Sequence, residues 1–69
     1  MPGMRLTPTT RTRKALEREL RQAEYRGDVR TVKRILAMLA VVDGYVYAEI
    51  AALFQVSEES IRLWVKAFV

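Results

Sequence analysis

Apolar residues recur every three or four positions along most of the chain, which is the spacing of amphipathic α-helices. Glycine and short polar residues interrupt this pattern at three places and divide it into four helical segments. The predicted helices cover residues 11–26, 29–42, 47–54 and 58–68. The sequence therefore predicts a small all-α domain of four helices within residues 9–69, preceded by a flexible N-terminal arm at residues 1–8 that contains both prolines.

Residues that favour helix ends stand at the predicted boundaries. Thr9 or Thr10 is expected to cap the first helix, because short polar side chains accept hydrogen bonds from first-turn N–H groups. Gly27 should end that helix in the left-handed conformation that glycine tolerates best. Asp28 and Ser57 are the expected N-caps of the second and fourth helices.

The Asp-Gly pair at residues 43–44 has a second interpretation. It stands between alternating β-forming residues, Val-Val before it and Tyr-Val-Tyr after it, which is the pattern of a β-hairpin. The Leu, Ala and Met residues before Asp43 favour a helix, and only three residues follow Gly44 before helical spacing resumes. We expect a helix and a turn, with the hairpin as the alternative.

The second helix is expected to be the centre of the core. Its main apolar face is formed by Val29, Val32, Ile35, Leu36 and Leu39, while Met38, Val41 and Val42 lie off this face. On the first helix, Leu16, Leu20 and Ala23 are expected to face inward. Glu17 is expected to pair with Arg21 on the outer surface, at the favourable spacing of four residues.

Composition limits the chemistry. A chain of 69 residues forms one domain at most. It has neither Cys nor His, so the usual metal ligands, general bases and thiol nucleophiles are missing, and we expect no enzyme activity, no cofactor and no metal site. The longest apolar run, Ile35 to Val42, is far shorter than the roughly 20 residues of a membrane helix. No signal-peptide apolar stretch follows Arg5, and we expect an intracellular protein.

The net charge of +4 makes the chain a candidate for binding nucleic acid. Residues 1–44 hold ten Lys and Arg against five Asp and Glu, whereas residues 45–69 hold two against three. The candidates for phosphate contacts lie at the start of the first helix and around the first turn, and they are Arg11, Arg13, Lys14, Arg26, Arg30, Lys33 and Arg34. A solvated helical surface balanced by nearby glutamates is the alternative interpretation.

Residues 45–69 fit the demands of a helix-turn-helix, in which two short helices cross around a tight turn. Ala51 is the small residue at the close approach, and Val56 fills the turn. Inward-facing apolar residues come from both helices, namely Ile50 and Phe54 from the first and Ile61 and Trp64 from the second.

When the apolar residues of the last helix face the core, its period places Glu58, Glu59, Arg62, Leu63 and Lys66 outward. The N-terminal part of such a helix faces base edges in the major groove. The base-reading candidates are therefore Ser57, Glu58, Glu59, Arg62 and Lys66, and Tyr47 is a further candidate for phosphate contact. Each has a purely structural alternative: Ser57 as a helix cap, the glutamates as partners of the helix dipole, the cations as solvated residues.

Residues 43–68 read Asp-Gly-Tyr-Val-Tyr-Ala-Glu-Ile-Ala-Ala-Leu-Phe-Gln-Val-Ser-Glu-Glu-Ser-Ile-Arg-Leu-Trp-Val-Lys-Ala-Phe. This stretch resembles the N-terminal homeodomain-like helix-turn-helix of bacterial insertion-sequence transposases related to the mariner group. Leu6-Thr7, the charged helix and the second helix leading to a glycine resemble the opening of those proteins, so the resemblance covers residues 5–68. This chain departs from the pattern at Gln55, where a glycine is usual, and at Glu58-Glu59, where polar or basic residues are commoner.

The resemblance implies recognition of the terminal inverted repeats of a mobile element, on the bacterial nucleoid in the cytoplasm. It also implies that strand cleavage belongs to a DDE catalytic domain outside these residues. We therefore expect a DNA-binding module whose partner is double-stranded DNA, with no membrane and no small-molecule substrate. The alternative is a protein-interaction module or small transcriptional regulator that forms a homodimer through exposed apolar surface at Met38, Val41, Leu63 and Val69.

Overall fold

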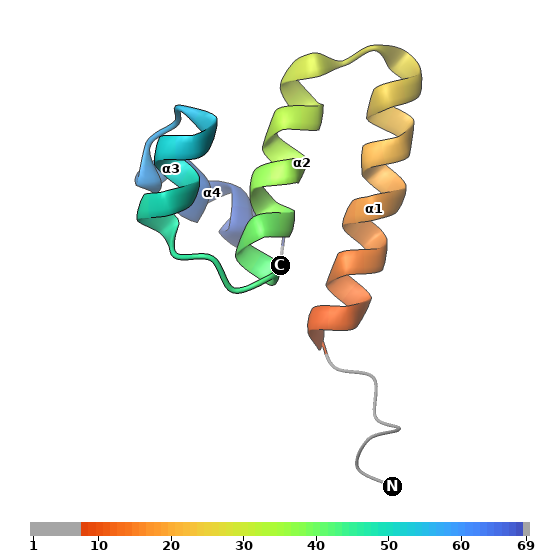
Figure 1. Ribbon diagram of the computed structural model, residues 1–69. Coiled ribbons are helices and arrows are strands. Elements are labelled where there is room, and N and C mark those ends of the chain that lie inside the picture. Colours follow the sequence, from red (N-terminus) through yellow and green to blue (C-terminus); the bar gives the residue numbers. More distant parts are fainter. Residues whose placement is uncertain (1–7, 69) are drawn as a thin grey trace, which may run out of the picture.

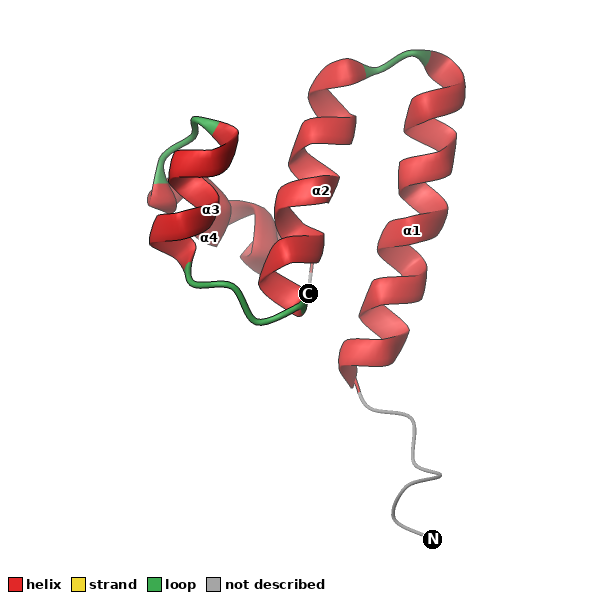
Figure 2. Ribbon diagram, viewed as in Figure 1, coloured by secondary structure: helices red, strands yellow, loops and turns green. Residues whose placement is uncertain are grey.

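The computed structural model describes residues 8–68 and contains four helices in that range (Figure 1). They are α1 (Pro8–Arg26), α2 (Val29–Val42), α3 (Tyr47–Phe54) and α4 (Glu58–Phe68). Figure 2 shows helices joined by short loops, and no strand occurs within the described range. The predicted all-α, four-helix fold is confirmed, and the alternative of a hairpin at residues 43–44 is wrong.

α1 begins three residues earlier than predicted, at Pro8. Proline suits the first helical position because its fixed backbone angle is already helical and because the N–H that it lacks would have no partner there. Thr9 and Thr10 lie inside the first turn, so the prediction that one of them caps the helix is wrong. The predicted arm otherwise falls on residues 1–7, which lie outside the described residues.

Glycine closes both α1 and α2. Gly27 has a φ of 73°, its N–H donates to the carbonyl of Glu24 at 3.1 Å, and the N–H of Asp28 donates to that of Ala23 at 2.9 Å. Gly44, with a φ of 95°, ends α2 through the same pair of bonds. These bonds satisfy carbonyl groups that would otherwise lack partners at a helix end. The predicted role of Gly27 is confirmed.

Asp28 caps α2, as predicted. Its carboxylate accepts hydrogen bonds from the backbone N–H of Thr31 at 3.1 Å and from the Thr31 hydroxyl at 2.6 Å. The pKa of Asp28 lies below its ordinary value, mainly because of the hydrogen bond from the Thr31 hydroxyl and next because of the bond from the Thr31 N–H. Arg26 makes a smaller contribution. The α1–α2 turn is therefore fixed from both sides, by Gly27 and by Asp28.

α2 supplies the centre of the core and contributes to two clusters. The first cluster joins α2 to α1 through Leu16, Ala23, Ile35 and Met38, and the second joins α2 to α3 and α4 through Ala37, Ile50 and Ile61. Trp64 and Val65 of α4 pack against both clusters. Burial of each fully enclosed Leu or Ile stabilises the fold by about 1.5–3 kcal/mol. α1 lies along one flank of α2, and α3 and α4 lie on the other (Figure 1).

The face of α2 that is buried differs from the one predicted. Met38 is buried, whereas Val29 is 77% exposed and Leu36 is 39% exposed. The reason is that α1, α3 and α4 together surround the side of α2 that carries Ile35, Ala37 and Met38, and no described helix covers the side that carries Val29 and Leu36. The prediction of a core stripe is thus right for Ile35 and wrong for these two residues.

The predicted pairing of Glu17 with Arg21 is also wrong. Glu17 instead pairs with Arg13, one turn earlier, at 3.2 Å between Arg13 Nη1 and Glu17 Oε2. Arg13 is half-buried and also forms an ion pair with Asp43, at the end of α2. Its guanidinium therefore links the first half of α1 to the α2–α3 turn.

Candidate nucleic-acid interface

α3 and α4 are joined by the three residues Gln55, Val56 and Ser57. Gln55 adopts the left-handed conformation, with a φ of 57° and a ψ of 48°, and the N–H of Val56 donates to the carbonyl of Ala51 at 3.0 Å. Ile50 and Ile61 are almost fully buried where the two helices meet. The turn is thus closed by the same backbone geometry that Gly27 and Gly44 provide elsewhere, here with a glutamine.

Ser57 caps α4, as predicted. Its Oγ accepts a hydrogen bond from the backbone N–H of Ser60 at 3.0 Å, and its hydroxyl donates to Ser60 Oγ at 2.9 Å. Glu58 and Glu59 follow in the first turn of α4, where negative charge suits the positive end of the helix dipole. The local structure accounts for all three residues without a ligand.

The outward face of α4 carries the other predicted reading residues. Glu59, Arg62 and Lys66 are exposed, and Leu63 is exposed with them. Ile61 is fully buried on the opposite face, and Trp64, Val65 and Phe68 are half-buried there. The predicted division of α4 into inward and outward faces is confirmed.

The structure brings three of the candidate residues together. The guanidinium of Arg62 lies 5.6 Å from the centroid of the Tyr47 ring, at the start of α3. Its Nη2 atom lies 3.4 Å from Glu58 Oε1, one turn earlier in α4. Arg62 is thus held over an aromatic ring and beside a carboxylate, while its side chain remains 60% exposed. The contact with Tyr47 crosses from α4 to α3, and sequence spacing alone did not reveal it.

A second group of cations lies beside the turn between α3 and α4. Arg30, Lys33 and Arg34 of α2 line a shallow hollow of about 200 Å³ together with Val56 and Trp64. The Arg34 guanidinium lies 5.7 Å from the centroid of the Trp64 ring, a cation–π contact. The spacing of Trp64 predicts a core position, and its side chain does pack against the core. It is only half-buried, however, and it also lines this basic hollow.

The remaining predicted phosphate contacts do not join this group. Arg11 and Lys14 are exposed near the start of α1, and Lys14 is separated from Arg26 by about 18 Å of helix at 1.5 Å per residue. Arg13 is engaged with Glu17 and Asp43, and Arg26 lies 3.6 Å from the carboxylate of Asp28. The predicted phosphate-contact residues of α1 therefore lie at its two ends, and none of them lines the hollow formed by the three α2 cations.

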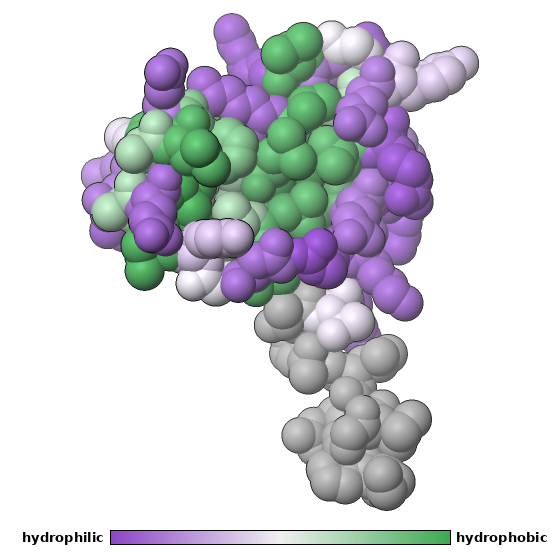
Figure 3. All heavy atoms as spheres, in the orientation of Figure 1, coloured by the Kyte–Doolittle hydropathy of each residue, from purple (hydrophilic) through white to green (hydrophobic). Residues whose placement is uncertain are grey.

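The apolar surface also differs from the prediction. Met38 is buried and Val41 is half-buried, while Leu63 is 57% exposed and Val69 lies outside the described residues. The most exposed large apolar side chains of α2 and α3 are instead Val29 and Leu53. Figure 3 shows hydrophobic side chains gathered over α2 and α3 on one face of the molecule.

None of the four helices within residues 8–68 is long and apolar enough to cross a membrane. In comparisons with family models, with curated proteins and with solved structures, nothing matches this chain.

Proposed function

We propose that this domain binds double-stranded DNA, with α3 and α4 acting as a helix-turn-helix and the outward face of α4 entering the major groove. The support is geometric. A short helix, a three-residue turn and a second helix present Arg62 and Lys66 to solvent on one face. Arg62 is the residue best suited to read a base, since a guanidinium can donate two hydrogen bonds to guanine.

The observation that carries the proposal is the basic hollow of Arg30, Lys33 and Arg34 beside the turn. A helix in the major groove is flanked by phosphates, and cations next to its N-terminal end can anchor them. These three cations come from a different helix, so the charge that α4 lacks is supplied by α2. Backbone anchoring by α2 and base reading by α4 together form one interface.

The acidic start of α4 shapes the proposed interface. Glu58 neutralises part of the charge on Arg62, and Glu59 adds a negative charge on the exposed surface. Phosphate contacts therefore come mainly from α2, and the affinity depends strongly on salt because it arises from released counterions.

The resemblance to insertion-sequence transposases supports a narrower form of the proposal. In this form the target is the terminal inverted repeat of a mobile element, and a separate catalytic domain cuts the strand. The resemblance rests on residues 5–68 and concerns recognition only; no residue of this chain is assigned to the cleavage step.

A fluorescence anisotropy titration of labelled duplex at several salt concentrations tests the proposal. The wild-type chain should bind with an affinity that falls steeply with salt. Replacing Arg62→Ala together with Lys66→Ala should weaken binding about tenfold or more, since one good bidentate base contact is worth roughly 1–3 kcal/mol. The charge-matched control, Arg11→Ala with Lys14→Ala on α1, should leave duplex binding at α4 and the basic hollow unchanged, because neither residue lines that hollow. Absence of binding even at low salt would rule the proposal out.

Self-association is the second candidate function, and the apolar face over α2 and α3 favours it. Figure 3 shows hydrophobic side chains gathered over these two helices. Val29 of α2 is 77% exposed and Leu53 of α3 is 76% exposed. Contiguous apolar surface of this kind often marks an interaction site. Sedimentation of the wild type and of Leu53→Glu tests it: a dimer that the variant abolishes supports the candidate, and a monomer at every concentration rules it out.

A further inference from the structure

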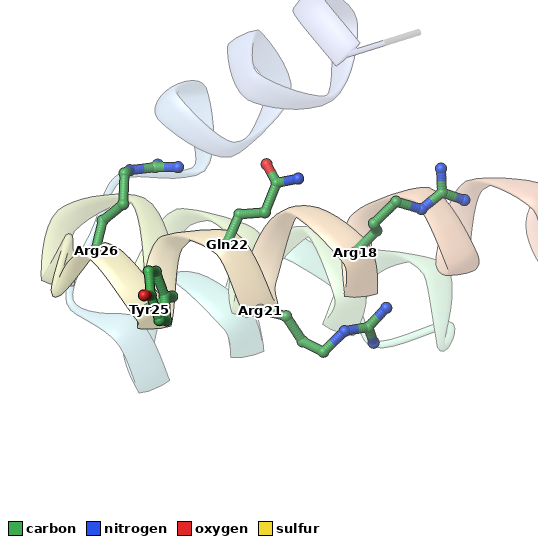
Figure 4. Close-up of a pocket in the computed structure, with 5 residues that line it drawn as sticks. All are labelled: Arg18, Arg21, Gln22, Tyr25 and Arg26. Atoms are coloured by element: carbon green, nitrogen blue, oxygen red, sulfur yellow. The ribbon is translucent and has the colours of Figure 1, made fainter.

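The outer surface of α1 carries a continuous basic stripe that the proposed interface does not use. Its members recur at intervals of three and four residues, which places them on one face of the helix. They are Arg11, Lys14, Arg18, Arg21 and Tyr25, and all five are exposed. At 1.5 Å per residue the stripe is about 21 Å long. Figure 4 shows its C-terminal half, where Arg18, Arg21 and Tyr25 project from α1 together with Gln22 and Arg26.

The fold does not require this stripe. Leu16 and Ala23, which are almost fully buried, face α2 from the opposite side of α1. Glu17 pairs with Arg13, so Arg18 and Arg21 have no carboxylate partner among the side chains described. Like charges at these spacings destabilise an isolated helix. Tyr25 is 94% exposed and packs against nothing that would explain an aromatic residue. An external partner accounts for the pattern better than internal packing does.

The chemistry of the stripe identifies the kind of partner. Arginine forms paired hydrogen bonds with phosphate, and a row of cations about 5 Å apart along a helix matches a polyanion that carries charge along its whole length. The stripe contains no aliphatic side chain, unlike the core of a protein–protein interface. The apolar face of α1 is already packed against α2, so the helix has no free apolar face to insert into a membrane surface. These features favour the nucleic-acid backbone.

We propose that the α1 stripe binds the backbone of a second DNA duplex, so that one domain bridges two duplexes. This inference rests on the proposed function. α1 lies along one flank of α2, whereas α3 and α4 lie on the other flank (Figure 1). Helical spacing places the stripe on the side of α1 opposite Leu16 and Ala23, which pack in the core cluster with α2. No stripe residue lines the basic hollow, which is formed by α2, the α3–α4 turn and Trp64. The two surfaces therefore engage two duplexes, the first by α4 with the α2 cations and the second through phosphate contacts alone.

Energy transfer between two duplexes tests the bridge. Short duplexes of about 14 base pairs, roughly 48 Å long, are labelled separately with a donor and an acceptor and mixed with the full chain at low salt. The wild type should give energy transfer and should saturate at two duplexes per chain. Arg18→Gln with Arg21→Gln should abolish the transfer while one duplex still binds. For binding of the second duplex, the slope of log K against the logarithm of the salt concentration should become shallower by about 1.8. This corresponds to about 0.9 for each of the two lost phosphate contacts.

The matched control carries the same loss of charge on α4, Arg62→Gln with Lys66→Gln, and should weaken binding of the first duplex instead. All four side chains are exposed, so both variants should keep their helices, and circular dichroism should be used to check this. If the wild type binds one duplex without energy transfer, the bridge is wrong and the proposed function stands. If it binds no duplex, both are wrong. The bridge is also wrong if energy transfer persists in the α1 variant. It is equally wrong if the stripe binds phosphatidylserine vesicles and does not bind a second duplex.

Discussion

Arg62 of α4 lies over the ring of Tyr47 of α3, with 5.6 Å between the guanidinium carbon and the ring centroid. The contact spans the two helices on either side of the turn and fixes the direction of the arginine that we assign to base reading. A side chain ordered before binding loses less conformational freedom when it meets its target. Tyr47 is therefore expected to act by positioning Arg62, whereas a direct phosphate contact through its hydroxyl is the alternative role.

Replacing Tyr47 separates these two roles. Tyr47→Ala should weaken binding to duplex DNA by about two- to fivefold, because an exposed cation–π contact contributes roughly 0.5–1 kcal/mol. Tyr47→Phe keeps the ring and should bind like the wild type in the same anisotropy titration. If both variants lose the same affinity, the hydroxyl contacts the phosphate directly and the positioning role is wrong.

Removing the charge of Glu58 should strengthen binding. Glu58 pairs with Arg62 at 3.4 Å and repels phosphate, so Glu58→Gln releases the guanidinium and removes one repulsion. We expect an affinity for mixed-sequence duplex about two- to fivefold higher, in line with about 0.2–1 kcal/mol for an exposed ion pair. Glu59→Gln is the matched control: it changes the charge equally without touching Arg62 and should gain less. A lower affinity in Glu58→Gln would instead assign Glu58 to base reading.

The turn contains residual strain that glycine should relieve. Gln55 has a φ of 57°, a conformation that costs a non-glycine residue about 1–2 kcal/mol. Glycine loses more backbone entropy on folding, so Gln55→Gly should stabilise the domain by a net of about 0.5–1 kcal/mol. For a domain of this size that raises Tm by roughly 2–8 °C in a calorimetric scan. Gln55→Ala should show no such gain, and a lower Tm for Gln55→Gly would contradict the left-handed geometry.

The cap of α2 should make part of the stability sensitive to acid. The pKa of Asp28 is lowered in the folded state by its bonds to Thr31. Its contribution is therefore fully present above the ordinary aspartate pKa of about 3.9 and is lost as the pH falls through the lower folded value. Asp28→Asn still caps the helix but does not titrate. The wild type should have the higher Tm at neutral pH, and the difference should shrink in strong acid; a constant difference would contradict the linkage.

The sequence predicted the helices well because its end signals are local. Asp28, Gly27 and Ser57 each act on residues within one turn of themselves, and the structure confirms all three roles. The start of α1 was misplaced because the threonines resemble caps, while Pro8 can itself occupy the first helical position.

Contacts between helices could not be predicted in the same way. The pairing of Arg13 with Asp43 joins residues 30 positions apart, which helical spacing cannot reveal. The Arg34–Trp64 contact likewise depends on how α4 crosses α2. Helical periodicity indicates which residues share a face, but it does not indicate which face the neighbouring helices cover. For this reason Met38, predicted off the main core face, is buried, and Val29, predicted on that face, is exposed.

The most direct test of the proposed DNA-binding face is an amide chemical-shift titration of the labelled chain with a short duplex at low salt. If α4 and the α2 cations bind DNA, the largest shift changes should fall in residues 57–66 and at Arg30, Lys33 and Arg34 of α2, at ratios of up to one duplex per chain. Shift changes confined to the apolar face around Leu36 and Leu53, or no changes at all, would contradict this proposal.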